Sequence, residues 1–186
     1  MQVRAQTLAD VAIPSSGLLS RPLVRDAILI IGFSLLTALF AQIAFRLPFT
    51  TVPITGQTFA VLLTGAALGS KRGASSMGLY MVLGLIIPVF APGNSALEGQ
   101  SVHFIFPWVG TSGLIWSMTS GGYIVGFIFA AYFVGMLAER SWDRGWKVSI
   151  AMLGGNVLVY VFGLAWLGYV IGSHTLDSSL GFNLSE

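Results

Sequence analysis

Residues 148–172 read VSIAMLGGNVLVYVFGLAWLGYVIG and contain no charged side chain. A helix needs about twenty apolar residues to cross the roughly 30 Å hydrocarbon core of a bilayer, and this stretch is long enough. A soluble domain of 186 residues could not bury it within a composition that is 55% hydrophobic and only 9% charged. The sequence therefore predicts an integral membrane protein.

Four more charge-free stretches precede this one, and short segments that hold almost every charge separate them. In the second stretch Pro53, Thr55, Gly56 and Gln57 occupy the first turns, so regular helix is expected only from about Thr58. The fold class is therefore an all-α, polytopic transmembrane bundle. Its five predicted spans are Ala27–Phe45, Val52–Ser70, Gly73–Pro92, Gly121–Ala138 and Val148–Gly172.

The distribution of Lys and Arg predicts the orientation, because cytoplasmic loops retain these residues in excess. An N-terminus inside the cell leaves only Arg46 outside. We expect a multi-pass protein with a cytoplasmic segment at 1–25, a transmembrane domain at 26–172 and a polar extracytoplasmic tail at 173–186. The residues assigned to the cytoplasmic side are Arg4, Arg21, Arg25, Lys71, Arg72, Arg140, Arg144 and Lys147.

Several kinds of chemistry have no support in the sequence. The chain has no cysteine, which excludes disulfides, thiolate catalysis and iron–sulfur clusters. His103 and His174 are isolated, and no Asp or Glu lies inside a span, so no metal site and no coupling to protons or sodium is expected. Without a run of basic residues, nucleic acid is not an expected partner.

A serine peptidase is a weaker hypothesis. Gly110-Thr-Ser112-Gly113 matches the Gly-x-Ser-Gly pattern of intramembrane serine proteases, with His174 as the base. Ser112 lies in a predicted loop, however, and His174 lies beyond the fifth span. We therefore interpret the motif as an ordinary turn and assign no catalytic residue.

A polar but uncharged cluster marks the start of the second helix at Thr55, Gly56 and Gln57. The Gln amide both donates and accepts hydrogen bonds, which suits a neutral, amide-like or ureido ligand better than an ion. Asn94, at the outer end of the third span, adds a second such group. Tyr80 and Tyr123 are candidates to line the site, although aromatic residues on helices also serve simply as packing.

Pairs of small residues four positions apart allow close approach of helix backbones in lipid. Such pairs either hold the helices of one subunit together or form a docking surface for another protein. The first helix is the candidate for docking. The pairs are Ser34 with Ala38, Thr37 with Ala41, Gly65 with Gly69, Gly122 with Gly126, and Gly168 with Gly172.

Four ordered blocks resemble one family. They are PFTTVPITGQT at 48–58, GAALGSKRG at 65–73, GLIIPVFA at 84–91 and SGGYIVGF at 120–127. Together they are similar to BioY, the biotin-binding substrate subunit, or S component, of energy-coupling-factor transporters. The likeness runs in order from about Asp26 to the fifth helix.

The resemblance implies a six-helix bundle in the cell membrane, the inner membrane in bacteria, that takes up biotin and is not an enzyme. It implies no cofactor apart from the ligand biotin. The implied partners are a transmembrane coupling subunit and two ATPases. The implied ligand residues are Thr55, Gly56 and Gln57, with Tyr80, Phe90 and Tyr123 as walls, and the implied docking residues are Ser34, Thr37, Ala38 and Ala41.

Two departures from the family pattern keep alternatives open. Met118-Thr119-Ser120 stands where the family has Gly-Pro-Thr, and the family's sixth helix, with its Pro-Gly-Asp-x-x-Lys segment, does not follow Gly172. One alternative is a subunit that no longer binds ligand and only docks partners. Another is a substrate subunit for a different vitamin, such as riboflavin, thiamin or niacin.

Overall fold

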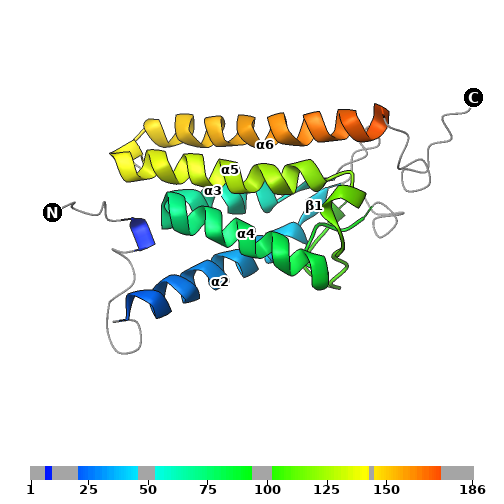
Figure 1. The fold of residues 1–186 in the computed structure, drawn as a ribbon, viewed down its shortest axis with the longest axis horizontal. Helices are drawn as coiled ribbons and strands as arrows, with labels where there is room; N and C mark the ends of the chain where they lie inside the picture. Colours follow the sequence, from blue (N-terminus) through cyan, green and yellow to red (C-terminus); the bar gives the residue numbers. More distant parts are fainter. Residues whose placement is uncertain (1–6, 10–20, 46–52, 94–101, 143–144, 173–186) are drawn as a thin grey trace, which may run out of the picture.

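The computed structural model describes residues 7–9, 21–45, 53–93, 102–142 and 145–172. In Figure 1 the helices extend along the long axis of the molecule, with α5 and α6 side by side on one flank and α2 on the other. The predicted all-α bundle is confirmed. The α-helices of twelve residues or more in these ranges are α2 (Pro22–Ala41), α3 (Gln57–Leu68), α4 (Ser70–Ile86), α5 (Gly121–Leu137) and α6 (Lys147–Gly172).

A small antiparallel sheet closes one end of the bundle, which we call the sheet end (Figure 1). Its strands are β1 (Ala44–Phe45), β2 (Ile54–Thr55) and β3 (Val102–His103), in the order β2-β1-β3. A 3-10 turn, η3 (Ile115–Ser117), precedes α5. The sequence did not predict the sheet, because strands of two residues are too short to show an alternating pattern.

Helix α2 begins five residues before the predicted first span, inside the predicted 1–25 segment. Pro22 occupies its first turn, where a missing N–H costs nothing. The helix can contain charged residues because they have partners: Asp26 pairs with Arg72 at 2.7 Å, and Arg25 donates to the Ala9 carbonyl at 3.0 Å. The apolar pattern alone therefore placed this boundary too late.

Helix α4 has a defined start and end. At its start, the Glu139 carboxylate accepts the Ser70 backbone N–H at 2.8 Å and also its hydroxyl, which caps α4 from the π-helical turn η4 (Ala138–Trp142) after α5. At its end, Ile87 is extended because Pro88 disfavours helical geometry in the residue before it. The third span was therefore predicted too long.

Not all five helices are long enough to cross a bilayer alone. Among the described residues, α2, α5 with its π-helical turn, and α6 meet the length and hydropathy of a membrane span. The twelve residues of α3 reach only about 18 Å at 1.5 Å per residue. Its regular helix begins at Gln57, close to the expected Thr58, and β2 takes the place of its first turns.

Close backbone packing joins the α3–α4 hairpin to α5. Gly69 is the single residue between α3 and α4, with a φ of 82° that favours glycine. A Cβ on Gly65 would overlap the backbone of Ala131, and one on Gly135 would overlap the backbone of Gly69. Two pairs of small residues thus allow direct backbone contact between these helices.

The predicted docking face on α2 is not on the surface. Its four small residues form the inner stripe of α2 and are at most 3% exposed, and the Thr37 hydroxyl contacts the Met77 sulfur of α4 at 4.0 Å. Small residues here allow α2 to pack inside its own bundle. The four buried residues are Ser34, Thr37, Ala38 and Ala41.

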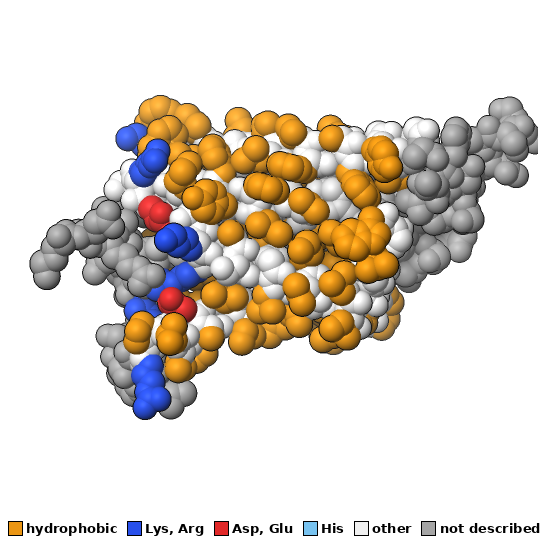
Figure 2. Space-filling view, viewed as in Figure 1, with side chains coloured by type: hydrophobic (Ala, Val, Ile, Leu, Met, Phe, Trp, Pro, Cys, Tyr) orange, Lys and Arg blue, Asp and Glu red, His pale blue; other side chains and the backbone are white. Residues whose placement is uncertain are grey.

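Charged side chains gather at the end of the bundle opposite the sheet, which we call the charged end (Figure 2). Apolar side chains cover most of the remaining length in this view, as expected for a surface that faces lipid. This separation agrees with the alternation of charged and uncharged loops in the sequence. The described Lys and Arg residues are Arg21, Arg25, Lys71, Arg72, Arg140 and Lys147.

The substitution Gly135→Ala tests the backbone contact. We expect it to lower the free energy of unfolding by about 1–3 kcal/mol, because the added methyl must push the α3–α4 turn away from α5. The matched control is Gly168→Ala, where a Cβ would have no neighbour within 4 Å. Thermal unfolding in detergent measures both, and equal melting temperatures would contradict the proposed packing.

Candidate functional site

The predicted uncharged cluster lies at the sheet end, where β2 leads into α3. Thr55 on β2 donates a hydrogen bond from its hydroxyl to the Gln57 side-chain carbonyl at 2.9 Å. The Gln57 amide donates to the Tyr80 hydroxyl of α4, which in turn donates to the Val89 carbonyl at 3.0 Å. The structure thus joins three predicted site residues, Thr55, Gln57 and Tyr80, into one hydrogen-bonded chain.

Two further predicted residues flank this chain. The Phe90 ring meets the Tyr80 ring edge-on, with centroids 5.5 Å apart, and it rests on the bare backbone of Gly84. Gly56 is the N-cap of α3, and a Cβ there would press against the backbone and ring of Phe40 at the end of α2. Phe90 is therefore an apolar wall of the cluster. Gly56 allows the start of α3 to approach the end of α2 closely.

Four backbone carbonyls after α4 need partners, because the chain is extended there and cannot form helical hydrogen bonds. Side chains from α4, from the residue after α2 and from the segment before α5 bond all four, and the Thr111 backbone N–H also bonds the Phe90 carbonyl at 3.2 Å. The pairs are Pro88 with Trp108 Nε1 (2.6 Å), Val89 with Tyr80 Oη (3.0 Å), Phe90 with Gln42 Nε2 (3.3 Å) and Ala91 with Thr111 Oγ1 (2.8 Å).

Gln42 is a site residue that the sequence analysis missed. It is fully buried just after α2, where it donates to the Phe90 carbonyl and accepts the Val109 N–H at 3.3 Å. It therefore connects the segment after α4 with the segment before α5. The available signal was an amide within an otherwise apolar predicted span, the same signal that identified Gln57.

Two predicted site residues do not join the hydrogen-bonded chain. Tyr123 packs its ring over Gly163 of α6 and meets the Tyr160 ring edge-on at 6.0 Å. It therefore acts in helix packing in this structure. Asn94 lies outside the described residues.

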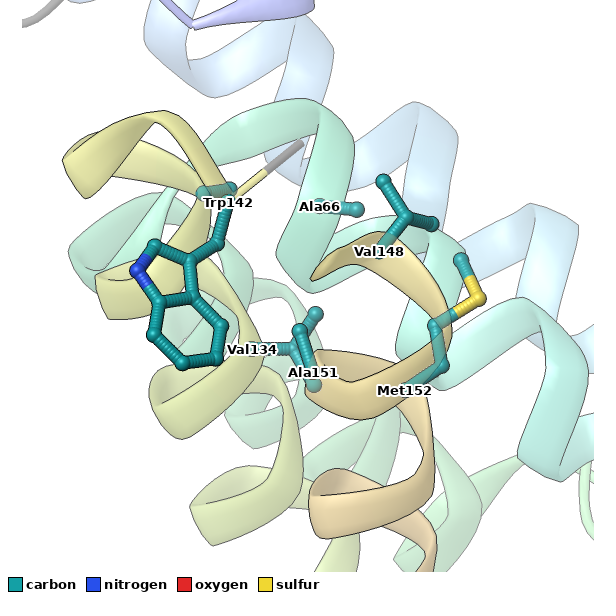
Figure 3. A pocket seen from close by; sticks show the side chains of 7 residues that line it. Ala66, Val134, Trp142, Val148, Ala151 and Met152 are labelled. Atoms are coloured by element: carbon teal, nitrogen blue, oxygen red, sulfur yellow. The ribbon is translucent and has the colours of Figure 1, made fainter. Parts of the chain in front are cut away.

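The cluster is closed, because Gln57, Tyr80 and Phe90 are 6%, 0% and 1% exposed. A small pocket lies instead near the charged end, between α3, α5 and α6 (Figure 3). Its lining is almost entirely apolar and includes none of the predicted site residues. The lining residues are Ala66, Val134, Ala138, Trp142, Val148, Ala151 and Met152.

The described residues provide no support for a metal site or for a serine peptidase. Among the described residues, no three His, Asp or Glu side chains lie close enough to hold a metal ion. Ser112 lies in an irregular segment before α5, and His174 lies outside the described residues. The pairing required for a serine peptidase is therefore not observed.

Comparisons with known proteins identify a family. Residues 6–184 match the model of the BioY family. A protein named biotin transporter BioY from Rhizobium etli is 32% identical over 154 residues, which cover 74% of this chain and 74% of that protein. A probable biotin transporter BioY from Pyrococcus horikoshii is 32% identical over 149 residues, covering 80% and 77%.

The fold is similar to a solved structure. The crystal structure of the S-component for biotin from an ECF-type ABC transporter matches with a TM-score of 0.64 and 23% sequence identity. The match covers 88% of this chain and 82% of that one. At this identity the similarity establishes the fold, which is that of an S-component.

Tyr80→Phe tests the hydrogen-bonded chain. The change leaves the buried Gln57 amide and Val89 carbonyl without a partner, so we expect a loss of about 1–3 kcal/mol of stability. Tyr132→Phe on α5, where the side chain is 48% exposed, is the matched control and should change stability by less than about 0.5 kcal/mol. Unfolding in detergent measures the stability of both variants. An equal free energy of unfolding would contradict a stabilising role for the hydrogen-bonded chain.

Proposed function

The chain belongs to the BioY family, and we propose that it is the membrane-embedded subunit that binds biotin and mediates its uptake. The observation that carries the proposal is the uncharged, hydrogen-bonded chain of Thr55, Gln57 and Tyr80 at the sheet end, in which Gln57 and Tyr80 are buried. Relatives of this chain carry the name biotin transporter. The protein is a transport subunit rather than an enzyme.

The chemistry of the cluster suits the bicyclic head of biotin. Its ureido group is neutral and has two N–H donors and one carbonyl acceptor, which the amide of Gln57 and the hydroxyls of Thr55 and Tyr80 can satisfy. The sulfur-containing ring suits the apolar face of Phe90. Because the cluster is closed, biotin enters by displacing the Phe90 ring from Gly84 and exchanging hydrogen bonds with the chain.

We place the sheet end outside the cell and the charged end, with the N-terminus, in the cytoplasm. The segregation of the described Lys and Arg to one end of the bundle supports this orientation (Figure 2). The proposed biotin site then lies on the side of the membrane from which the vitamin arrives. The surrounding membrane is the inner membrane of a bacterial cell.

Energy for uptake comes from a separate coupling subunit and two ATPases. Within the described helices the acidic residues are Asp26 and Glu139, and both are engaged near the charged end, by Arg72 and Ser70. Neither lies at the proposed site, where a proton- or sodium-coupled transporter would place one. The partner subunits bind a surface other than the buried small-residue stripe of α2.

Binding of tritiated biotin to the purified protein in detergent tests the proposal. We expect saturable binding that Gln57→Ala weakens at least roughly tenfold, because the variant loses hydrogen bonds in a buried site. Tyr132→Phe, at the surface of α5, should bind as the unaltered protein does. Unlabelled riboflavin should not compete.

Two results would overturn the assignment. Competition by riboflavin would indicate a substrate subunit for another vitamin. No binding of biotin by the folded protein, together with recovery of a coupling subunit in pulldowns, would indicate a subunit that only docks partners.

The orientation has its own test, because the chain has no cysteine to remove. We expect Leu114→Cys, at the sheet end, to react with a membrane-impermeant maleimide in intact cells. Lys71→Cys and Lys147→Cys, at the charged end, should react only after the membrane is opened. The reverse pattern would invert the proposed topology.

A further inference from the structure

The three-stranded sheet at the sheet end has one inner and one outer row of side chains. Ala44 of β1 pairs with Thr55 of β2 on one side and with His103 of β3 on the other. Directly paired residues project from the same face of a sheet, so Thr55, Ala44 and His103 share a face. Ala44 is fully buried and His103 is 5% exposed, so this row faces the interior.

The neighbouring row faces away from the bundle. Ile54, Phe45 and Val102 are 52%, 42% and 40% exposed. Alternation along each strand therefore fixes the direction of His103: its side chain points to the same side as Thr55, the first residue of the hydrogen-bonded chain.

His103 is buried with an unused polar atom. Its Nε2 is shielded from solvent and has no hydrogen-bond partner among the described residues. A buried polar group without a partner is unfavourable, and in a native protein it calls for an explanation such as a ligand. In this row only the methyl group of Ala44 stands between Thr55 and His103.

Two facts indicate which part of a ligand His103 meets. Across two strand spacings, the backbones of Thr55 and His103 lie roughly 10 Å apart, so one ligand with polar groups at both ends can reach both. The described Lys and Arg residues all lie at the charged end, so none of them is at the sheet end to meet a carboxylate, whereas the His103 imidazole is there and can donate from Nε2.

We propose that His103 Nε2 binds the carboxylate of the ligand, while the Thr55, Gln57 and Tyr80 chain binds its neutral head. This inference rests on the proposed function, since biotin has a ureido group at one end and a carboxylate at the other. His103 is then a specificity residue, because an imidazole N–H that meets a carboxylate forms a charge-assisted hydrogen bond that a neutral ligand end does not.

Competition binding with biotin and biotinamide, which lacks the carboxylate, tests the inference. His103→Leu should weaken biotin roughly tenfold and biotinamide less than about twofold, so the preference for biotin disappears. His103→Gln keeps a neutral donor and should show an intermediate preference. Val102→Ala, on the outer row of the same strand, is the matched control and should change neither affinity.

The outcomes separate this inference from the proposed function. If the unaltered protein binds neither ligand, the biotin assignment fails and the inference fails with it. If the unaltered protein binds biotin and His103→Leu weakens both ligands equally, or neither, only the role of His103 is overturned. If His103→Leu does not fold, His103→Gln provides the test. An unchanged preference of that variant for biotin over biotinamide would contradict the role of His103 in binding the carboxylate.

Discussion

The rest of the structure depends on the backbone contact between the α3–α4 turn and α5. Gly69 and Gly135 meet there without a side chain between them, and Glu139, just beyond α5, caps the first turn of α4. In lipid, where burial of apolar surface cannot drive helices together, such close packing must replace it. Gln57 lies at the far end of α3 and Tyr80 in the far half of α4, so the same contact fixes how these two side chains meet.

The second constraint is that irregular backbone must be satisfied inside the protein. Pro88 ends α4 and leaves a run of carbonyls that no helix can use, and side chains from three different segments bond them. Tyr80 takes part in both systems, since it receives the Gln57 amide and donates to Val89. The candidate site and the support of the backbone are therefore one network, which makes the geometry of the site sensitive to the loops that cover it.

The sequence predicted the features that local chemistry decides. Charge-free length predicted the five helices, and the amide of Gln57, which follows Pro53 and Gly56, indicated a polar site by its chemistry alone. Features that depend on tertiary contacts were not predictable. Helix α2 starts early because Arg72, far along the chain, pairs with Asp26. His103 was dismissed as isolated, since only the pairing of β1 with β3 shows which way it faces.

The small-residue motifs have neighbours that the sequence does not specify. Gly65 lies against the α5 backbone and Gly69 against Gly135 of α5. Gly122 and Gly126 meet side-chain and backbone atoms of α6, and Gly168 and Gly172 meet nothing within 4 Å. The three motifs are equivalent in sequence, and only topology assigns each a neighbour. The stripe on α2 is a further case, because a helix that is apolar on every side gives no hydropathy signal for its inner face. Small residues show that another helix can approach closely. They do not show whether that helix belongs to the same chain or to a partner.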